Sequence, residues 1–256
     1  MFDKKKVILN HILASKCRNK RAQKFFNKIS SMLLERSEIE EDKNYSVLEL
    51  SSRNNILKNL FKKKKIKNSF FQTILTNEIN KKYNYVVISD TENQIFNYNC
   101  FDICYCIFSL NTVENPLSVF KNIYDVLVKN GKFLTVLPSQ DNLKEFKSFF
   151  FDYFDIKKNT SFHPYLDIQT LGNIGYSSSF RNVIVDKESF NFQITEASDL
   201  WLFIRSLGEG NSLLNRNEFK LNKTVFKKFK NDYNQEIKHG SLRNNTLSFN
   251  FFIGTK

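Results

Sequence analysis

Short apolar runs that alternate with polar or helical segments constrain the fold of this chain most. They lie at residues 46–50, 69–75, 85–88, 103–108 and 132–137. Strands covered by helices on both faces show continuous apolar runs of this kind. The pattern therefore predicts an α/β fold with a largely parallel sheet. A chain of 256 residues fits one such domain, so we expect a single domain over residues 1–256.

Helical spacing fills the stretches between and around these runs. Apolar side chains from Phe25 to Leu33 predict a helix over about residues 18–36. Asn115 and Pro116 open another helix, which we expect Lys129-Asn130-Gly131 to stop, because glycine adopts positive φ readily. Further elements are predicted in the last third: helices from about 167, over 197–207 and over 223–237, and strands over 180–185 and 246–253.

The formal net charge of +13 raises the question of a nucleic-acid partner. No nucleic-acid-binding motif accompanies the charge, and a biased composition rich in Lys, Asn, Phe and Ile explains it, so we expect no nucleic acid. Residues 1–28 hold nine Lys or Arg against one acidic residue, as a mitochondrial transit peptide can. Because this segment runs into a helical pattern, we interpret residues 1–40 as a basic helical extension packed on the domain.

Three clustered cysteines raise the question of a metal site. Cys104 and Cys106 share one face of a predicted buried strand, and no histidine is near them or Cys100 in sequence. We therefore expect reduced thiols and no metal. No apolar run reaches the 18 or so residues that span a bilayer, so no integral membrane segment is expected. Peripheral contact through the basic N-terminus stays open.

The segment FDICYCIFSLNTVENPLSVFKNIYDVLVKNGKFLTVLP, residues 101–138, resembles the fourth strand, helix and fifth strand of class I S-adenosylmethionine-dependent methyltransferases. Other segments are similar to the BioC-type branch: VISDTENQIFNYNCFD (87–102), SQDNLKEF (139–146), HPYLDIQTLGNIGYSSSFRNVIVD (163–186) and DLWLFIRSLGEGNSL (199–213). The "G-E-x-N" segment and the N-terminal MFDKK resemble the sub-branch of the mitochondrial complex I assembly factor, regarded as an arginine hydroxylase. The resemblance implies a Rossmann-like fold with a seven-stranded, mostly parallel sheet, helices on both faces and an antiparallel last strand.

The resemblance also implies S-adenosylmethionine as cofactor and places residues around it. They are Glu49, Leu50, Ser51 and Arg53 at the end of the first strand, Asp90 and Thr91 after the third, and Cys106 and Ile107 in the fourth. Tyr165, Asp167, Arg205, Glu209 and Asn211 fall in segments that the resemblance places over the substrate mouth. Ordinary turn, cap or loop roles are the alternative for these residues. No catalytic residue is assigned.

The stretch VLELSSRNN, residues 47–55, departs from the family's glycine-rich turn, which lets backbone approach the cofactor closely. Ser51, Arg53 and Asn55 stand at the three glycine positions, and the first glycine of the chain is Gly131. Arg53 brings a cation toward a cofactor that carries a sulfonium, so it either turns outward or fills the pocket. Ile74 stands where the family has the acid that holds the ribose, and Glu78 substitutes for it only if the second strand runs further than predicted.

Three hypotheses for the function follow. The first is an S-adenosylmethionine-dependent enzyme that modifies a protein or an acyl carrier protein. The second is an assembly factor that binds a subunit of respiratory complex I. The third is a non-catalytic pseudo-methyltransferase that keeps the fold, for which Arg53 packed into the pocket is expected. The expected location is the bacterial cytoplasm, or the mitochondrial matrix if the source is eukaryotic.

Overall fold

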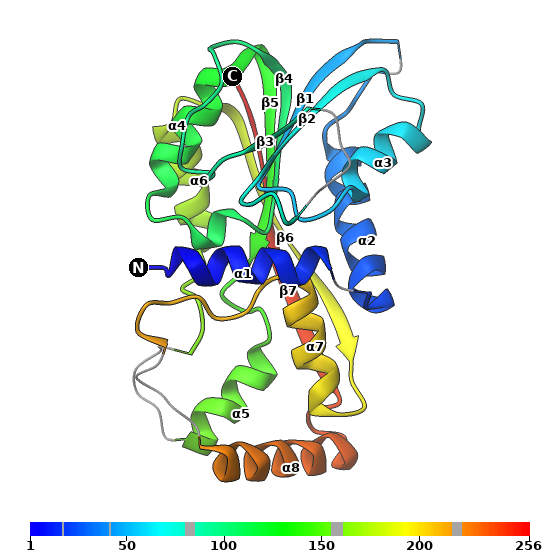
Figure 1. Ribbon diagram of the computed structural model, residues 1–256, viewed down its shortest axis with the longest axis vertical. Coiled ribbons are helices and arrows are strands. Elements are labelled where there is room, and N and C mark those ends of the chain that lie inside the picture. The colour runs from blue at the N-terminus through cyan, green and yellow to red at the C-terminus, as the bar shows by residue number, and fades with distance from the viewer. Residues whose placement is uncertain (17, 41, 80–84, 155–160, 217–221) are drawn as a thin grey trace.

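The computed structural model describes residues 1–16, 18–40, 42–79, 85–154, 161–216 and 222–256 (Figure 1). Its seven strands stand in the order β3-β2-β1-β4-β5-β7-β6. They are β1 (Tyr45–Leu50), β2 (Asn68–Ile74), β3 (Val86–Ile88), β4 (Phe101–Ile107), β5 (Leu127–Pro138), β6 (Arg181–Gln193) and β7 (Asn244–Thr255). Strands β1 to β5 pair in parallel, whereas β7 runs antiparallel to β5 and β6. The predicted seven-stranded, mostly parallel sheet with an antiparallel last strand is thereby confirmed.

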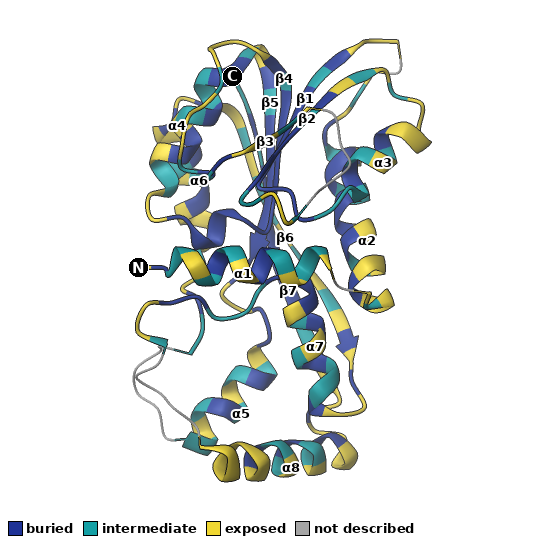
Figure 2. Cartoon of the chain, viewed as in Figure 1, coloured by how far each residue is buried: buried dark blue, intermediate teal, exposed yellow. Residues whose placement is uncertain are grey.

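Helices cover both faces of the sheet, as predicted. On one face lie α4 (Pro116–Val126) and α6 (Ile168–Ser177), which pack on Leu48, Cys104 and Phe133. On the other face, α2 (Lys20–Arg36) and α3 (Ile56–Lys63) share a core with Val47 and Tyr105. Neighbouring strand residues divide between the two cores because successive side chains point to opposite faces. Figure 2 shows that burial is densest along these central strands.

Three further helices extend the second core below the parallel strands in Figure 1. They are α5 (Lys144–Phe154), α7 (Ala197–Leu207) and α8 (Lys223–His239), and a one-turn 3₁₀ helix, η1 (Leu110–Thr112), follows β4. The sequence predicted α7 and α8, but not α5 as a helix. Strand β6 is longer than the predicted 180–185.

Local sequence signals fix several helix starts. The Asn115 side chain accepts a hydrogen bond from Ser118 N, with Pro116 in the first turn of α4. The Asp167 side chain accepts one from Thr170 N at the start of α6. The carboxylate therefore has a capping role, and hydrogen bonding lowers the pKa of Asp167 below its usual range.

The Gly131 prediction needs correction. Helix α4 ends at Val126 and β5 begins at once at Leu127, so Gly131 lies within the strand. The residue with positive φ is Asn130, at 64°. Glycine is required at 131 for space, because a Cβ there would lie 2.8 Å from Val128 O.

The basic N-terminal extension forms two helices. Besides α2, helix α1 (Lys4–Ser15) crosses the molecule where the parallel strands end (Figure 1). The α1 residues Val7, Asn10 and His11 are buried. Since the carboxyl ends of parallel strands are where α/β folds bind ligands, α1 lies over the candidate site.

Candidate functional site at the carboxyl ends of the strands

The turn after β1 keeps an unusual backbone although it has no glycine. Ser51 has φ 47°, in the left-handed region. Its backbone N donates to Thr73 Oγ1 at 2.8 Å, and Ser52 N donates to Thr73 O at 2.8 Å. Two bonds to β2 thus hold the turn in a conformation that glycine adopts more easily than serine.

Arg53 turns inward from this turn, and its side chain is 1% exposed. Nη1 donates to Glu209 Oε1 at 2.7 Å and also to Leu207 O, while Nη2 donates to Phe108 O. Asn111 Nδ2 donates to the other Glu209 oxygen at 2.7 Å. Burial raises the pKa of Glu209, whereas the guanidinium and the Asn111 amide act in the opposite direction. The guanidinium therefore fills the space beside the glycine positions and joins the β1 turn to the segment after α7.

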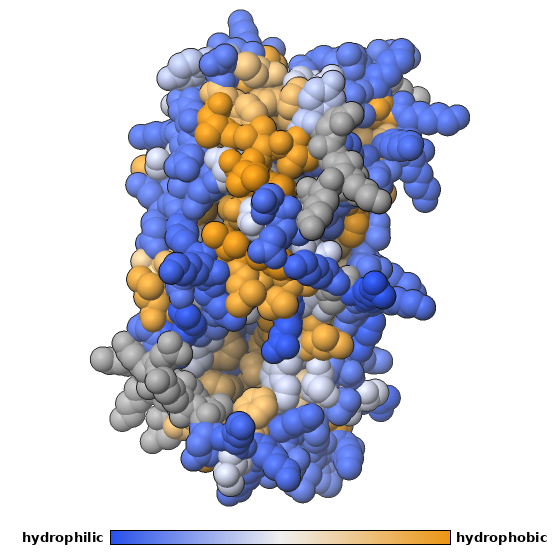
Figure 3. Space-filling view, in the orientation of Figure 1, coloured by the Kyte–Doolittle hydropathy of each residue, from blue (hydrophilic) through white to orange (hydrophobic). Residues whose placement is uncertain are grey.

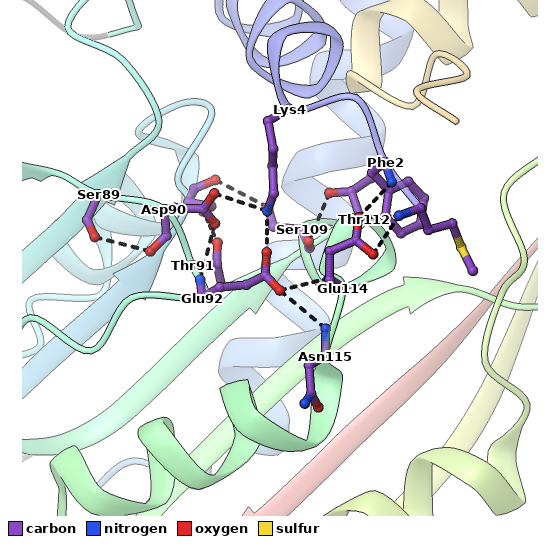
Figure 4. Close-up of polar contacts among 12 residues, drawn as sticks. Phe2, Lys4, Ser89, Asp90, Thr91, Glu92, Ser109, Thr112, Glu114 and Asn115 are labelled. Carbon is purple, nitrogen blue, oxygen red and sulfur yellow. Dashed lines mark hydrogen bonds and ion pairs between the residues drawn. The ribbon is translucent and has the colours of Figure 1, made fainter. Parts of the chain in front are cut away.

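An acidic turn follows β3 (Figure 4). Asp90 Oδ1 accepts from Glu92 N at 3.1 Å, and Glu92 Oε1 accepts from Glu114 N at 2.8 Å. Lys4 of α1 reaches into this turn: Nζ lies 3.0 Å from Asp90 Oδ2 and also pairs with Glu92 Oε2. The ion pairs raise the pKa of Lys4 although partial burial opposes the shift. One ammonium thus pairs with both carboxylates from within the chain.

A cavity of about 70 Å³ remains beneath α1. One wall is the α1 stripe Lys4, Val7, Ile8 and His11, and the opposite wall includes Ser51, Leu75, Asp90, Thr91, Ser109, Thr112 and Val113. His11 is 1% exposed, and neither ring nitrogen has a hydrogen-bond partner in the described part of the chain. Burial lowers the pKa of His11 well below its usual range, so the ring is neutral at physiological pH. A smaller cavity of about 20 Å³, lined in part by Leu50, Asp90 and Thr91, lies beside it.

A second cavity of about 120 Å³ lies on the other side of Glu209. Tyr165, Glu209, Asn211 and Lys147 supply polar groups to it, among apolar walls that include Phe203 and Phe249. Burial lowers the pKa of Lys147 to about 8, with Asp141 opposing the shift. Figure 3 shows a hollow in the molecular surface below the level of α1. Glu209 lines this second cavity. Its partner Arg53 donates to Phe108 O, next to Ser109 in the wall of the cavity under α1. The Arg53–Glu209 ion pair therefore separates the two cavities.

The predicted cofactor residues divide into two groups. Leu50, Ser51, Asp90 and Thr91 line the cavity under α1 or the smaller one beside it. Glu49, Arg53, Cys106 and Ile107 are buried but line neither of these cavities. Glu49 accepts from Gln72 Nε2 at 2.8 Å, between β1 and β2.

The predicted substrate-side residues divide as well. Tyr165, Glu209 and Asn211 meet at the second cavity. Asp167 and Arg205 are exposed and do not line it. Sequence reasoning missed Lys4 and His11, although their spacing with Val7 and Ile8 is that of one helix face.

The second strand ends at Ile74, the position where the family has the ribose acid. Ile74 is 2% exposed and closes β2, and Glu78 lies beyond the strand. Glu78 is more than half exposed and pairs with Lys16 at 3.3 Å. Glu78 therefore does not take the place of the missing acid.

Other site types are not seen in the described ranges. No group of His, Cys, Asp and Glu there could hold a metal ion. Cys104 and Cys106 are buried and Cys100 is exposed. None of the helices described is long and apolar enough to cross a membrane.

Comparison with known proteins supports the predicted fold, and a family model matches part of the chain. Residues 62–135 match a family model described as a methyltransferase domain. No curated protein sequence is similar enough to count as a match. Among solved structures, a Bacillus halodurans protein assigned to the methyltransferases has 16% identity and a TM-score of 0.58, covering 90% of this chain and 99% of that one.

Two further structures carry the same fold. A SAM-dependent methyltransferase from Archaeoglobus fulgidus has 13% identity and a TM-score of 0.51, with 90% and 93% of the two chains covered. Phosphoethanolamine N-methyltransferase 2 of Haemonchus contortus, solved with S-adenosylhomocysteine, has 13% identity and a TM-score of 0.53. That match covers 90% of this chain and 52% of the other. The chain therefore has the Rossmann-like fold of class I methyltransferases.

S-adenosylmethionine does not fit the site as the structure arranges it. Pockets for ligands of this size measure about 300 Å³ or more, whereas the cavity under α1 is about 70 Å³. Lys4 already pairs with Asp90, which the resemblance places around the cofactor, and Arg53 fills the side of the glycine positions.

Proposed function

We propose, from the methyltransferase-domain match and the class I methyltransferase fold, that this chain is a methyltransferase-family protein that binds S-adenosylmethionine after α1 and Arg53 move. Its BioC-like and assembly-factor-like segments favour a protein or acyl carrier protein as the partner that it modifies or binds. A subunit of respiratory complex I is one such partner.

The backbone around the cavity carries this proposal. Ser51 and Phe108, which follow β1 and β4, hold φ values of 47° and 57°. Non-glycine residues in this region are strained, and such strain concentrates at functional sites. The turn after β1 is thus held in a strained conformation, and the Arg53 side chain fills the space beside it.

A second candidate function rests on Arg53 itself. Its guanidinium makes three hydrogen bonds in a buried setting, with only Nε lacking a partner among the described residues, and these bonds hold the pocket closed. In this candidate the chain is a non-catalytic pseudo-methyltransferase that acts through its surface as an assembly or binding factor.

Isothermal titration with S-adenosylmethionine and S-adenosylhomocysteine separates the two. The first proposal expects saturable binding by the native chain, and at least tenfold tighter binding by Arg53→Gly, which empties the space. Arg36→Gly is the control, because Arg36 pairs with Asp186 and Glu188 away from the site. No binding by the native chain, with binding by Arg53→Gly alone, would support the pseudo-methyltransferase instead.

A further inference from the structure

The contact between Lys4 and the acidic turn places a side chain of this protein where a ligand would bind. Nζ lies 3.0 Å from Asp90 Oδ2 and also pairs with Glu92 (Figure 4). The same Glu92 carboxylate accepts from Glu114 N and, at 3.2 Å, from Asn115 N. The ammonium is therefore tied to the turn after β3 and, through Glu92, to the start of α4.

We propose that α1 is an internal plug of the candidate site, which the Lys4 ammonium holds closed by occupying Asp90 and Glu92. A ligand whose base or amine requires Asp90 then binds only when α1 leaves. This inference rests on the proposed function for the identity of that ligand, but the plug itself is a property of α1.

The rest of α1 is positioned by the segment that follows α7. Phe2 forms a bridge with Leu213, and Asn10 Nδ2 donates to Gly210 O at 2.6 Å. Arg216 Nη2 lies 2.7 Å from Asp3 Oδ2. These contacts attach α1 to residues 208–216, the segment that also supplies Glu209 to Arg53. Movement of α1 is therefore coupled to the wall between the two cavities.

The underside of α1 is imperfectly packed, as expected for a helix that opens. It covers a cavity of about 70 Å³, and both His11 ring nitrogens there are buried without a partner in the described chain. Unpaired buried polar atoms and voids both reduce the stability of the closed form. The Lys4 and Asp90 side chains are 40% and 35% exposed, so their ion pair is screened and reversible.

Hydrogen exchange of the α1 amides tests the plug without any ligand. Lys4→Met removes the ammonium and keeps the aliphatic stem. Lys5→Met is the matched control, since Lys5 is exposed and forms no ion pair within the described residues. We expect the amides of residues 7–15 to exchange about tenfold faster in Lys4→Met than in Lys5→Met. Equal exchange rates in the two variants would overturn the plug.

Titration of the same variants with S-adenosylhomocysteine tests the ligand. We expect about tenfold tighter binding by Lys4→Met than by Lys5→Met. Asp90→Asn keeps the Lys4–Glu92 pair, so its α1 amides should exchange more slowly than those of Lys4→Met, and it should bind no more tightly than the native chain because the acid is lost. Faster exchange in Lys4→Met, with no binding by any variant, supports the plug and overturns S-adenosylmethionine binding as the proposed function.

Discussion

Arg53 determines what the candidate site can hold. Its charge is buried and balanced by Glu209, which lies 156 positions away in sequence. Burying two charges costs solvation free energy that only close pairing and further hydrogen bonds offset. The guanidinium donates such bonds to Leu207 O and Phe108 O. The pair therefore stabilises the closed site as a unit, and removal of one member leaves the other charge buried and without its ionic partner.

This dependence predicts a large loss of stability when one partner is removed. Glu209→Gln leaves the Arg53 charge buried and unpaired, and it should lower the free energy of unfolding by about 3 kcal/mol. Glu188→Gln is the control, because Glu188 is 39% exposed and Arg36 keeps Asp186 as a partner; it should cost about 0.5 kcal/mol. Urea unfolding measures both. Similar losses in the two variants would contradict the buried-pair interpretation.

Glu49 gives the stability a pH dependence. Burial raises its pKa from 4.5 to about 7, with Gln72 and Ser52 opposing the shift. The folded state therefore holds this proton more tightly than the unfolded state, and stability falls as pH rises from about 4.5 to about 7. The full cost above pH 7 is about 3 kcal/mol.

Glu49→Gln removes that cost while keeping an oxygen for Gln72. We expect the variant and the native protein to be equally stable near pH 4.5, and the variant to be about 3 kcal/mol more stable at pH 8. Denaturant unfolding across this range measures the difference. A difference that stays constant with pH would show that Glu49 is not the titrating group.

At the scale of elements, the sequence predicted those strands and helices whose burial produces a regular pattern of apolar residues. The strands β1, β2, β4 and β5 stood out because residues covered on both faces are apolar in succession. Helix α1 did not, because its inner stripe mixes Lys4 and His11 with Val7 and Ile8 and faces a cavity. The site was predictable only in part, since Ser51 and Asp90 follow strands, whereas the Arg53–Glu209 contact joins distant segments.

The first part of β5 depends on Gly131 for space. A Cβ there would lie 2.8 Å from Val128 O and 3.2 Å from Asp102 O, which are backbone atoms that cannot turn aside. Gly131→Ala should therefore lower the free energy of unfolding by about 2 kcal/mol. In Gly172→Ala, within α6, the new Cβ meets only Val185 Cγ2 at 3.8 Å, so helix propensity should raise stability by about 0.5 kcal/mol. Thermal unfolding compares the two, and a neutral Gly131→Ala would contradict the packing argument.

At the scale of the whole molecule, one apolar core connects the parallel strands with the helices below α1. The same cluster holds Val47 of β1, Phe26 of α2, Phe146 of α5 and Tyr233 of α8. Strand β7 passes between the two parts and contributes Phe249 and Phe251 to this cluster. Such continuity makes it costly for either part to unfold while the other stays native.

We therefore expect a single cooperative transition. Trp201, the only tryptophan, lies on α7 in the lower part of Figure 1, so its fluorescence reports that part. Far-UV circular dichroism reports the helices and strands of both parts. The two signals should give the same urea midpoint and the same m value. If Trp201 fluorescence changed at a lower midpoint, α5, α7 and α8 would form a separate unit and the shared core would not bind the two parts into one domain.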